Sequence, residues 1–235
     1  MKKYSLLCLL GFSMIGMSAC AAEQQTKQVP TITAHAGAMN TEANTIASVK
    51  ACIAAAKTGN IEVDVRFLAD GTPVLGHDEE HKSQGARLED CLALIAESQA
   101  GINLDLKEWT NIPGVVALVR QYGLEERAFF TGVGLNEIGT VKDSGLTYYL
   151  NCAPKALGLD AKKIVRTAAE CGVSGLNIHY RLCTQKLIDE ARAAGLAVSV
   201  WTVDKEPAMR KMIRYGVDNI TTRHPDVCEE LLYAD

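Results

Sequence analysis

Short apolar runs alternate with longer amphipathic stretches along nearly the whole chain after residue 30, and this alternation restricts the fold most. The short runs have the length of buried strands, whereas the stretches between them have helical periodicity, and several of these end at a glycine. No Pro- or Ser-rich linker divides the chain, which predicts a single domain. The predicted strands cover residues 31–35, 61–67, 102–106, 128–131, 147–151, 175–179, 197–203 and 219–222.

Eight strand–helix units within 235 residues favour a TIM (β/α)8 barrel, an α/β fold in which parallel strands close on themselves. An open doubly wound sheet has a similar alternation, so the strand count alone leaves both folds open. The segment 78–101 is too short for a large inserted subdomain. In a barrel, functional residues gather where the strands end and in the loops that follow.

The first twenty residues are typical of an export signal. Two lysines precede an apolar run at residues 6–17, which is too short to cross a bilayer permanently, so residues 1–19 are predicted to be removed. Ser18 and Ala19 before Cys20 resemble a lipoprotein signal, with Cys20 as the lipidated first mature residue, although Met17 also permits ordinary cleavage nearby. Residues 20–30 then form a tether, and residues 31–235 form the barrel. We expect a membrane-anchored lipoprotein of the bacterial envelope, or otherwise a periplasmic or secreted protein.

The overall charge argues for a small partner. A net charge of -4 and a pI near 5.8 provide no basic field for a polyanion, so nucleic acid is not expected to bind. The membrane would be reached only through the lipid anchor. The six cysteines after the leader match no zinc pattern, and either burial as small apolar residues or disulfide pairing is compatible with an exported protein.

Acidic side chains share one face on two of the predicted strands. Glu62 and Asp64 alternate with aliphatic residues, so both point into the barrel mouth, and Asn103, Asp105 and Lys107 repeat the pattern on the next strand. Crowded carboxylates in a half-enclosed site favour a bound cation, and ligation by oxygen alone suits Ca²⁺ or Mg²⁺. The alternatives are a solvated face for the first two acids and a simple ion pair for Asp105 and Lys107.

Two histidines are predicted at the same end of the barrel. Asp70 and Gly71 read as a two-residue hairpin loop, a register that places His77 directly opposite Asp64. His35 ends the first strand, where it could also be a helix cap or a core residue. Two imidazoles beside a metal–carboxylate cluster can protonate a leaving oxygen and activate an attacking one.

A weaker set of candidates lies on later strands. Asn177 and His179 share one face of the sixth strand and are candidate substrate contacts, although a lone histidine beside Tyr180 also fits a structural role. Lys107 is the candidate that neutralises a phosphate charge.

Several short motifs occur in a characteristic order across nearly the whole mature chain. They are residues 34–37 (AHAG), 44–45 (NT), 62–65 (EVDV), 71–78 (GTPVLGHD), 200–203 (VWTV) and 216–222 (GVDNITT). The ordered set resembles the glycerophosphodiester phosphodiesterase family, a barrel superfamily of metal-dependent phosphodiesterases that includes the spider-venom sphingomyelinase D enzymes. The resemblance implies a divalent metal, Ca²⁺ or Mg²⁺, and a small-molecule or lipid-headgroup phosphodiester as substrate.

The resemblance also implies roles for individual residues. His35 and His77 would be the acid–base pair, Lys107 a phosphate contact, and Trp201 a wall of the substrate pocket. The implied metal ligands are Glu62, Asp64 and Asp105.

Two departures from the family pattern affect the expected chemistry. Ala36 stands where the family usually has arginine, so one phosphate-binding cation is missing. Asp105 replaces the commoner glutamate, and residues 105–107 resemble the sphingomyelinase D branch. We therefore predict hydrolysis of glycerophosphodiesters or related headgroup diesters. The alternatives are a phospholipase-D-like or lyase reaction that forms a cyclic phosphate, and a phosphate-ester-binding lipoprotein without turnover.

Overall fold

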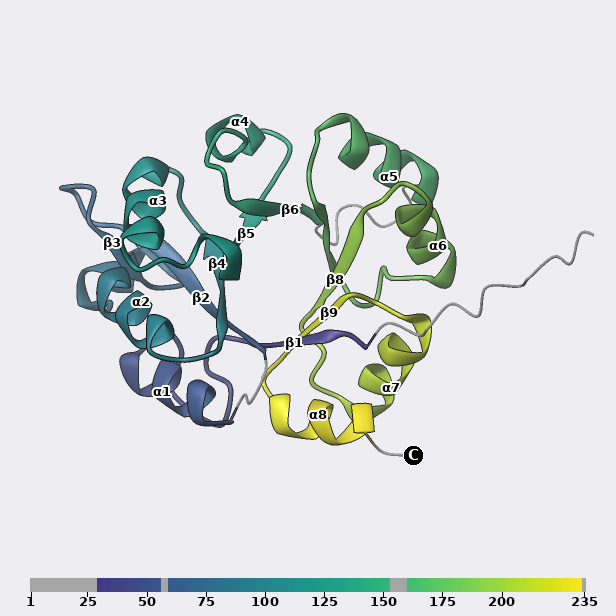
Figure 1. The fold of residues 1–235 in the computed structure, drawn as a ribbon, viewed down its shortest axis with the longest axis horizontal. Helices are drawn as coiled ribbons and strands as arrows, with labels where there is room; N and C mark the ends of the chain where they lie inside the picture. Colours follow the sequence, from purple (N-terminus) through teal and green to yellow (C-terminus); the bar gives the residue numbers. More distant parts are fainter. Residues whose placement is uncertain (1–28, 56–58, 153–159, 234–235) are drawn as a thin grey trace, which may run out of the picture.

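The computed structural model describes residues 29–55, 59–152 and 160–233, and its centre is a closed sheet of parallel strands (Figure 1). Neighbours run in the order β1-β9-β8-β7-β6-β5-β4-β2, and β1 also pairs with β2, which closes the barrel. The predicted TIM barrel is confirmed, because an open doubly wound sheet would leave its two edge strands unpaired. The strands are β1 (Thr31–Ala34), β2 (Asn60–Phe67), β3 (Pro73–Leu75), β4 (Gly101–Leu106), β5 (Ala128–Val133), β6 (Thr147–Cys152), β7 (Gly175–His179), β8 (Ala197–Trp201) and β9 (Asn219–Thr222).

Helices surround the barrel on its outside (Figure 1). Their sequences explain their limits: α7, for example, has proline in its first turn, buries Met209 and Met212, and ends at Gly216 in the left-handed conformation. The helices are α1 (Ile46–Ala55), α2 (Leu88–Ala96), α3 (Ile112–Gln121), α4 (Ile138–Val141), α5 (Ala161–Glu170), α6 (Gln185–Ala193), α7 (Glu206–Tyr215) and α8 (Pro225–Tyr233), with 3₁₀ turns η1 (Glu79–Gln84) and η2 (Glu125–Arg127).

All eight predicted barrel strands are present, and two of them end earlier than predicted: β1 ends at Ala34, one residue early, and β8 ends two residues early. β8 ends at Trp201 and not at Val203, whose backbone N–H instead donates to the carbonyl of Thr221 at 2.9 Å. The additional strand, β3, pairs antiparallel with β2 as the second arm of a hairpin. Because β8 ends at Trp201, Thr202 lies outside the strand and lines the pocket described below.

Most residues of the predicted export signal and tether lie outside the part of the chain that the structure describes. The predicted leader, the lipidated Cys20 and most of the tether fall within residues 1–28, which the structure does not describe. Among the residues it does describe, no helix is both long and apolar enough to cross a membrane. The cysteines within those residues are unpaired, and burial raises the pKa of the Cys91 thiol to about 12, which fits inert packing residues.

A glycine allows β5 to pass close to the end of β4. Gly132 has a φ of 75° and lies where the pairing of β5 with β6 shifts register. A Cβ at this position would overlap the backbone of Leu106 and lie 2.9 Å from the Asp105 carboxylate. The close approach of these two strands at the barrel mouth therefore depends on the absence of a side chain.

We expect Gly132→Ala to lower the free energy of unfolding by about 3 kcal/mol, because it adds backbone overlap to an unfavourable φ. Gly123→Ala is the matched control, since Gly123 has a similar φ of 64° and nothing within 4 Å of the added carbon. The control should cost only about 1 kcal/mol. Urea denaturation measures both, and equal losses would show that the overlap is relieved without cost.

Candidate active site

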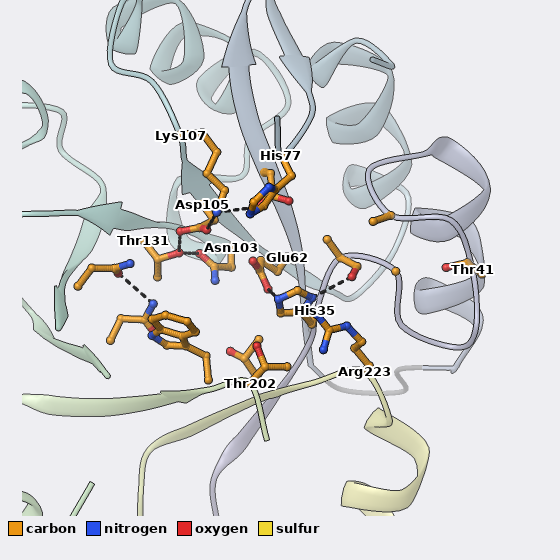
Figure 2. Close-up of a pocket in the computed structure, with 18 residues that line it drawn as sticks. His35, Thr41, Glu62, His77, Asn103, Asp105, Lys107, Thr131, Thr202 and Arg223 are labelled. Carbon is orange, nitrogen blue, oxygen red and sulfur yellow. Dashed lines mark hydrogen bonds and ion pairs between the residues drawn. The ribbon is translucent and has the colours of Figure 1, made fainter. Parts of the chain in front are cut away.

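A pocket of about 620 Å³ opens at the carboxyl ends of the barrel strands, a size typical of sites for small ligands (Figure 2). Figure 2 shows Glu62 and Asp105 pointing toward its centre, with His77 and Lys107 on one side and His35 on another. All of the predicted catalytic and metal-ligating residues line this pocket. The structure therefore brings together groups from β1, β2, β4 and the hairpin.

The predicted metal ligands converge because of strand register. Asp64 on β2 is directly paired with Asp105 on β4, and Glu62 lies two residues earlier on the same face. One carboxylate oxygen from each residue lies within 4.8 Å of the others. All three side chains are buried, so their charges are poorly screened by water.

These three carboxylates fit a hard divalent cation. Glu62 Oε2 is buried without a hydrogen-bond partner in the described structure, so one ligand atom is unsatisfied by protein. Burial raises the pKa of Glu62 well above its usual value, and the neighbouring charges of Asp105 and Asp64 raise it further. A divalent ion at this point would reverse that effect, and all-oxygen ligation suits Mg²⁺ or Ca²⁺.

Neighbouring polar groups fix the orientation of the acids. Asn44, in the left-handed conformation with a φ of 60°, donates from Nδ2 to Asp64 Oδ2 at 2.7 Å and accepts from the Asp64 backbone N–H at 2.9 Å. The hydroxyl of Thr131 lies 2.8 Å from Asn103 Oδ1 and 2.8 Å from Asp105 Oδ1. Such supports hold carboxylates ready for a metal.

Lys107 lies between two of the acids and does not face open solvent. Its Nζ is 2.9 Å from Asp64 Oδ1 and 2.5 Å from Asp105 Oδ2. Burial alone would lower the pKa of Lys107, but the charges of Asp105 and Asp64 outweigh burial and raise it. The ion pair, which the sequence left as an alternative, is thus the observed arrangement. A phosphate would have to compete with two carboxylates for this ammonium group.

His35 presents a free ring nitrogen to the pocket. Its Nδ1 lies 2.8 Å from the carbonyl oxygen of Ala36, which can only accept, so Nδ1 carries the proton. In the neutral ring Nε2 is then a proton acceptor, 3.9 Å from Glu62 Oε2. Burial lowers the pKa of His35, and the nearby Arg223 charge also lowers it, which favours the neutral ring.

The predicted hairpin register is wrong by one residue. The loop has three residues, closed by Gly71 with a φ of 83°, because the Leu68 N–H donates to the Thr72 carbonyl at 2.9 Å. Asp64 therefore lies opposite Gly76, whose N–H donates to the Asp64 carbonyl at 3.0 Å. β3 ends at Leu75 and the chain then turns, which brings His77 to the pocket by another path.

The wall formed by β7 and β8 offers unsatisfied polar groups. Trp201 Nε1 and Asn177 Oδ1 are both buried without a protein partner in the described structure, and both residues line the pocket. Asn177 donates from Nδ2 to Asn151 Oδ1 at 3.0 Å, which holds its amide in place. His179 is not among the residues that line the pocket; its ring packs on Tyr180 and edge-on to Trp201.

Comparison with known proteins gives consistent matches. The model of the glycerophosphoryl diester phosphodiesterase family matches residues 151–227. A curated glycerophosphodiester phosphodiesterase from Caldanaerobacter subterraneus is 24% identical over 248 residues, covering 86% of this chain and 97% of the relative. The chain is thus similar to the glycerophosphodiester phosphodiesterase family, with the family model matching its last third.

Solved structures related to this family share the fold. A phosphodiesterase from Oleispira antarctica, in complex with the product sn-glycerol-3-phosphate, matches with a TM-score of 0.75 at 19% identity, over 88% of this chain and 98% of that one. A glycerophosphodiester phosphodiesterase from Parabacteroides distasonis matches with a TM-score of 0.72 at 20% identity, over 88% and 98%. At these identities the likeness establishes the barrel alone.

Several residues that line the pocket were not predicted from the sequence. Thr131 and Asn151 lie on strands that carried no charged residue, and Arg223 follows the last strand directly. The position of Arg223 was a usable signal, because side chains just after a barrel strand reach the mouth.

An ion-pair network fixes the segment that carries His77. Arg66 donates from Nε to the His77 carbonyl at 2.9 Å and from Nη1 to Glu108 Oε1 at 2.6 Å. Glu108 also accepts from the Phe67 N–H at 3.0 Å and from Lys82 at 3.2 Å. Burial opposes ionisation of Glu108, but these hydrogen bonds prevail and lower its pKa to about 2. The network thus joins β2, η1 and the segment that follows β4.

The lowered pKa of Glu108 makes part of the stability dependent on pH. Because this carboxylate is ionised in the folded state down to about pH 2, its stabilisation is present above the unfolded pKa near 4.3 and is lost as the pH falls through about 2. We expect the stability difference between wild type and Glu108→Gln to shrink by on the order of 2 kcal/mol between pH 5 and 2, allowing for solvent screening.

Urea denaturation at several pH values tests this expectation. Glu125→Gln, which removes an exposed carboxylate from η2, is the control for the loss of one acidic group. Parallel pH profiles for wild type and Glu108→Gln would contradict the assignment.

Proposed function

We propose that this protein is a divalent-metal-dependent hydrolase that cleaves glycerophosphodiesters or related headgroup diesters. The observation that carries the proposal is the convergence of three carboxylates and two imidazoles on one pocket. The match to the family model and the product bound to the structurally similar Oleispira antarctica phosphodiesterase support a small phosphodiester as substrate. Two histidines within this pocket favour turnover over binding alone.

The ligands Glu62, Asp64 and Asp105 would hold the ion, which when bound supplies positive charge to polarise the phosphodiester. His35 is suited to accept a proton at Nε2, because its Nδ1 proton is committed to a carbonyl. His77 is suited to donate a proton to the departing alcohol oxygen. Its Nδ1 lies 2.8 Å from Asp78 Oδ1, and its side chain is 64% exposed, so it can be recharged from water.

The wall residues would recognise the organic part of the substrate. The Asn177 carbonyl oxygen can accept a hydrogen bond from a substrate hydroxyl, and the Trp201 indole N–H can donate to a substrate oxygen. Satisfying these buried groups would favour polyol headgroups over apolar ones.

A panel of phosphodiesters, assayed with and without a metal chelator, tests the proposal. Release of free alcohol together with a phosphomonoester supports hydrolysis, whereas a cyclic phosphate as final product supports the lyase alternative. Metal-dependent binding of diesters without turnover would instead support the binding protein.

We expect Asp64→Asn to lower both metal affinity and turnover by about 100-fold or more, because it removes a charged ligand. Titration calorimetry with Mg²⁺ and Ca²⁺ measures the affinity, and the diester assay measures turnover. Asp90→Asn, an exposed change on α2, is the control. Full activity of Asp64→Asn in the presence of chelator would refute the metal assignment.

We expect His77→Ala to reduce turnover by about 10²–10⁴-fold while metal affinity stays within about twofold, because His77 is assigned proton transfer. The same titration and assay separate the two effects. His224→Ala removes an exposed imidazole that is not among the pocket-lining residues, and it is the control. A loss of metal binding in His77→Ala would overturn this division of roles.

The leader sequence supports a separate proposal about location. We infer that the enzyme is exported and held at the bacterial envelope through a lipid on Cys20, close to membrane headgroup diesters. Ordinary signal cleavage would instead leave it periplasmic or secreted.

A further inference from the structure

Arg223 occupies a position at the mouth of the pocket that no assignment above uses. It is the first residue after β9, and it lines the pocket. Figure 2 shows its side chain beside His35, on the side of the pocket away from Lys107. Its side chain is 47% exposed, so a ligand entering the pocket can reach it.

The charges around the pocket leave this arginine a specific role. Among the described residues that line the pocket, Lys107 and Arg223 carry fixed positive charges, and Lys107 is held between Asp64 and Asp105. Metal ligation needs the three carboxylates ionised, which leaves one net negative charge against the two cations. A divalent ion turns this into one net positive charge, which matches a phosphodiester monoanion. Asp204, which is outside the pocket lining, offsets part of the Arg223 charge, and without Arg223 the excess of positive charge among the lining residues disappears.

The geometry of Arg223 leaves donors available. Its Nη1 donates to Asp204 Oδ2 at 2.7 Å, and Asp204 Oδ1 accepts from the Arg223 backbone N–H at 2.9 Å. Within the described structure, Nε and Nη2 have no protein acceptor. Asp204 therefore orients the guanidinium, and a forked pair of N–H groups remains for a phosphate. The neighbouring Ala36 offers no charge of its own.

We propose that Arg223, positioned by Asp204, binds the phosphate group of the substrate at the side of the pocket formed by His35. This proposal rests on the proposed phosphodiesterase function and names the residue that receives the substrate's charge. Lys107 then serves mainly to balance the metal ligands.

Inorganic phosphate is the probe, titrated calorimetrically into the full chain in the presence of Mg²⁺. We expect Arg223→Gln to weaken phosphate binding by about tenfold or more, because a charge-assisted forked contact is lost. Arg223→Lys should recover part of the affinity, since it keeps the charge but not the fork. Arg210→Gln is the matched control: Arg210 is 49% exposed and pairs with Glu206 at 2.8 Å, but it lies on α7 outside the pocket lining.

A second variant separates phosphate binding from local structure. Asp204→Asn removes the anionic partner but keeps Arg223 and an amide oxygen that can still accept from it, so phosphate affinity should fall less than it does in Arg223→Gln. If Asp204→Asn weakens binding as much as Arg223→Gln does, the arginine acts only through structure and the proposal fails. Wild-type affinity in Arg223→Gln also overturns it, as does absence of phosphate binding by the wild type.

The outcome is distinguishable from failure of the proposed function. If no diester is hydrolysed by the wild type, the function fails, while the phosphate titration still reports on Arg223. Where the wild type is active, Arg223→Gln should raise KM for a diester by about tenfold, with a smaller change in kcat.

Discussion

The site depends on one electrostatic constraint: β2 and β4 pair so that Asp64 lies beside Asp105, with Glu62 on the same face. Three buried carboxylates within 4.8 Å repel one another strongly in a medium of low dielectric constant. Lys107 balances part of this charge by contacting two of them, but Glu62 Oε2 remains without a hydrogen-bond partner in the described structure. A doubly charged ion bound among these carboxylates would therefore lower the free energy of the folded state.

The strand–helix alternation and the acidic faces could be predicted because both follow from local periodicity, whereas the strand count favours a closed barrel without excluding an open sheet. Alternation with a period of two fixes which side chains share a face, so Glu62, Asp64 and Asp105 were assigned before any neighbour was known. The position of His77 could not be derived in the same way. The hairpin register depends on whether Gly71 closes a loop of two or of three residues. A loop longer by one residue shifts every cross-strand pair between β2 and β3 by one position. His77 reaches the pocket because β3 ends at Leu75, which the pairing rule does not describe.

The contacts of the long cationic side chains also could not be predicted from the sequence. Lys107 and Arg223 each have several acceptors within reach, and the choice among them depends on charges drawn from separate strands. The structure shows Lys107 committed to Asp64 and Asp105, and Arg223 paired with Asp204 at the open side. Sequence alone suggested the first as the phosphate contact and overlooked the second. What decides between them is the local excess of negative charge, and that excess exists only once β2 and β4 are side by side.

The two imidazoles differ in ways that suit opposite roles in one reaction. His35 is largely buried, its Nδ1 proton is held by the Ala36 carbonyl, and burial lowers its pKa. His77 is mostly exposed, and its Nδ1 lies 2.8 Å from Asp78 Oδ1. When two groups of the same type lie in different environments, one site can supply both an acid and a base near neutral pH. Because the Arg66–Glu108 network holds the His77 backbone while the barrel holds His35, the separation is built into the fold and does not depend on the substrate.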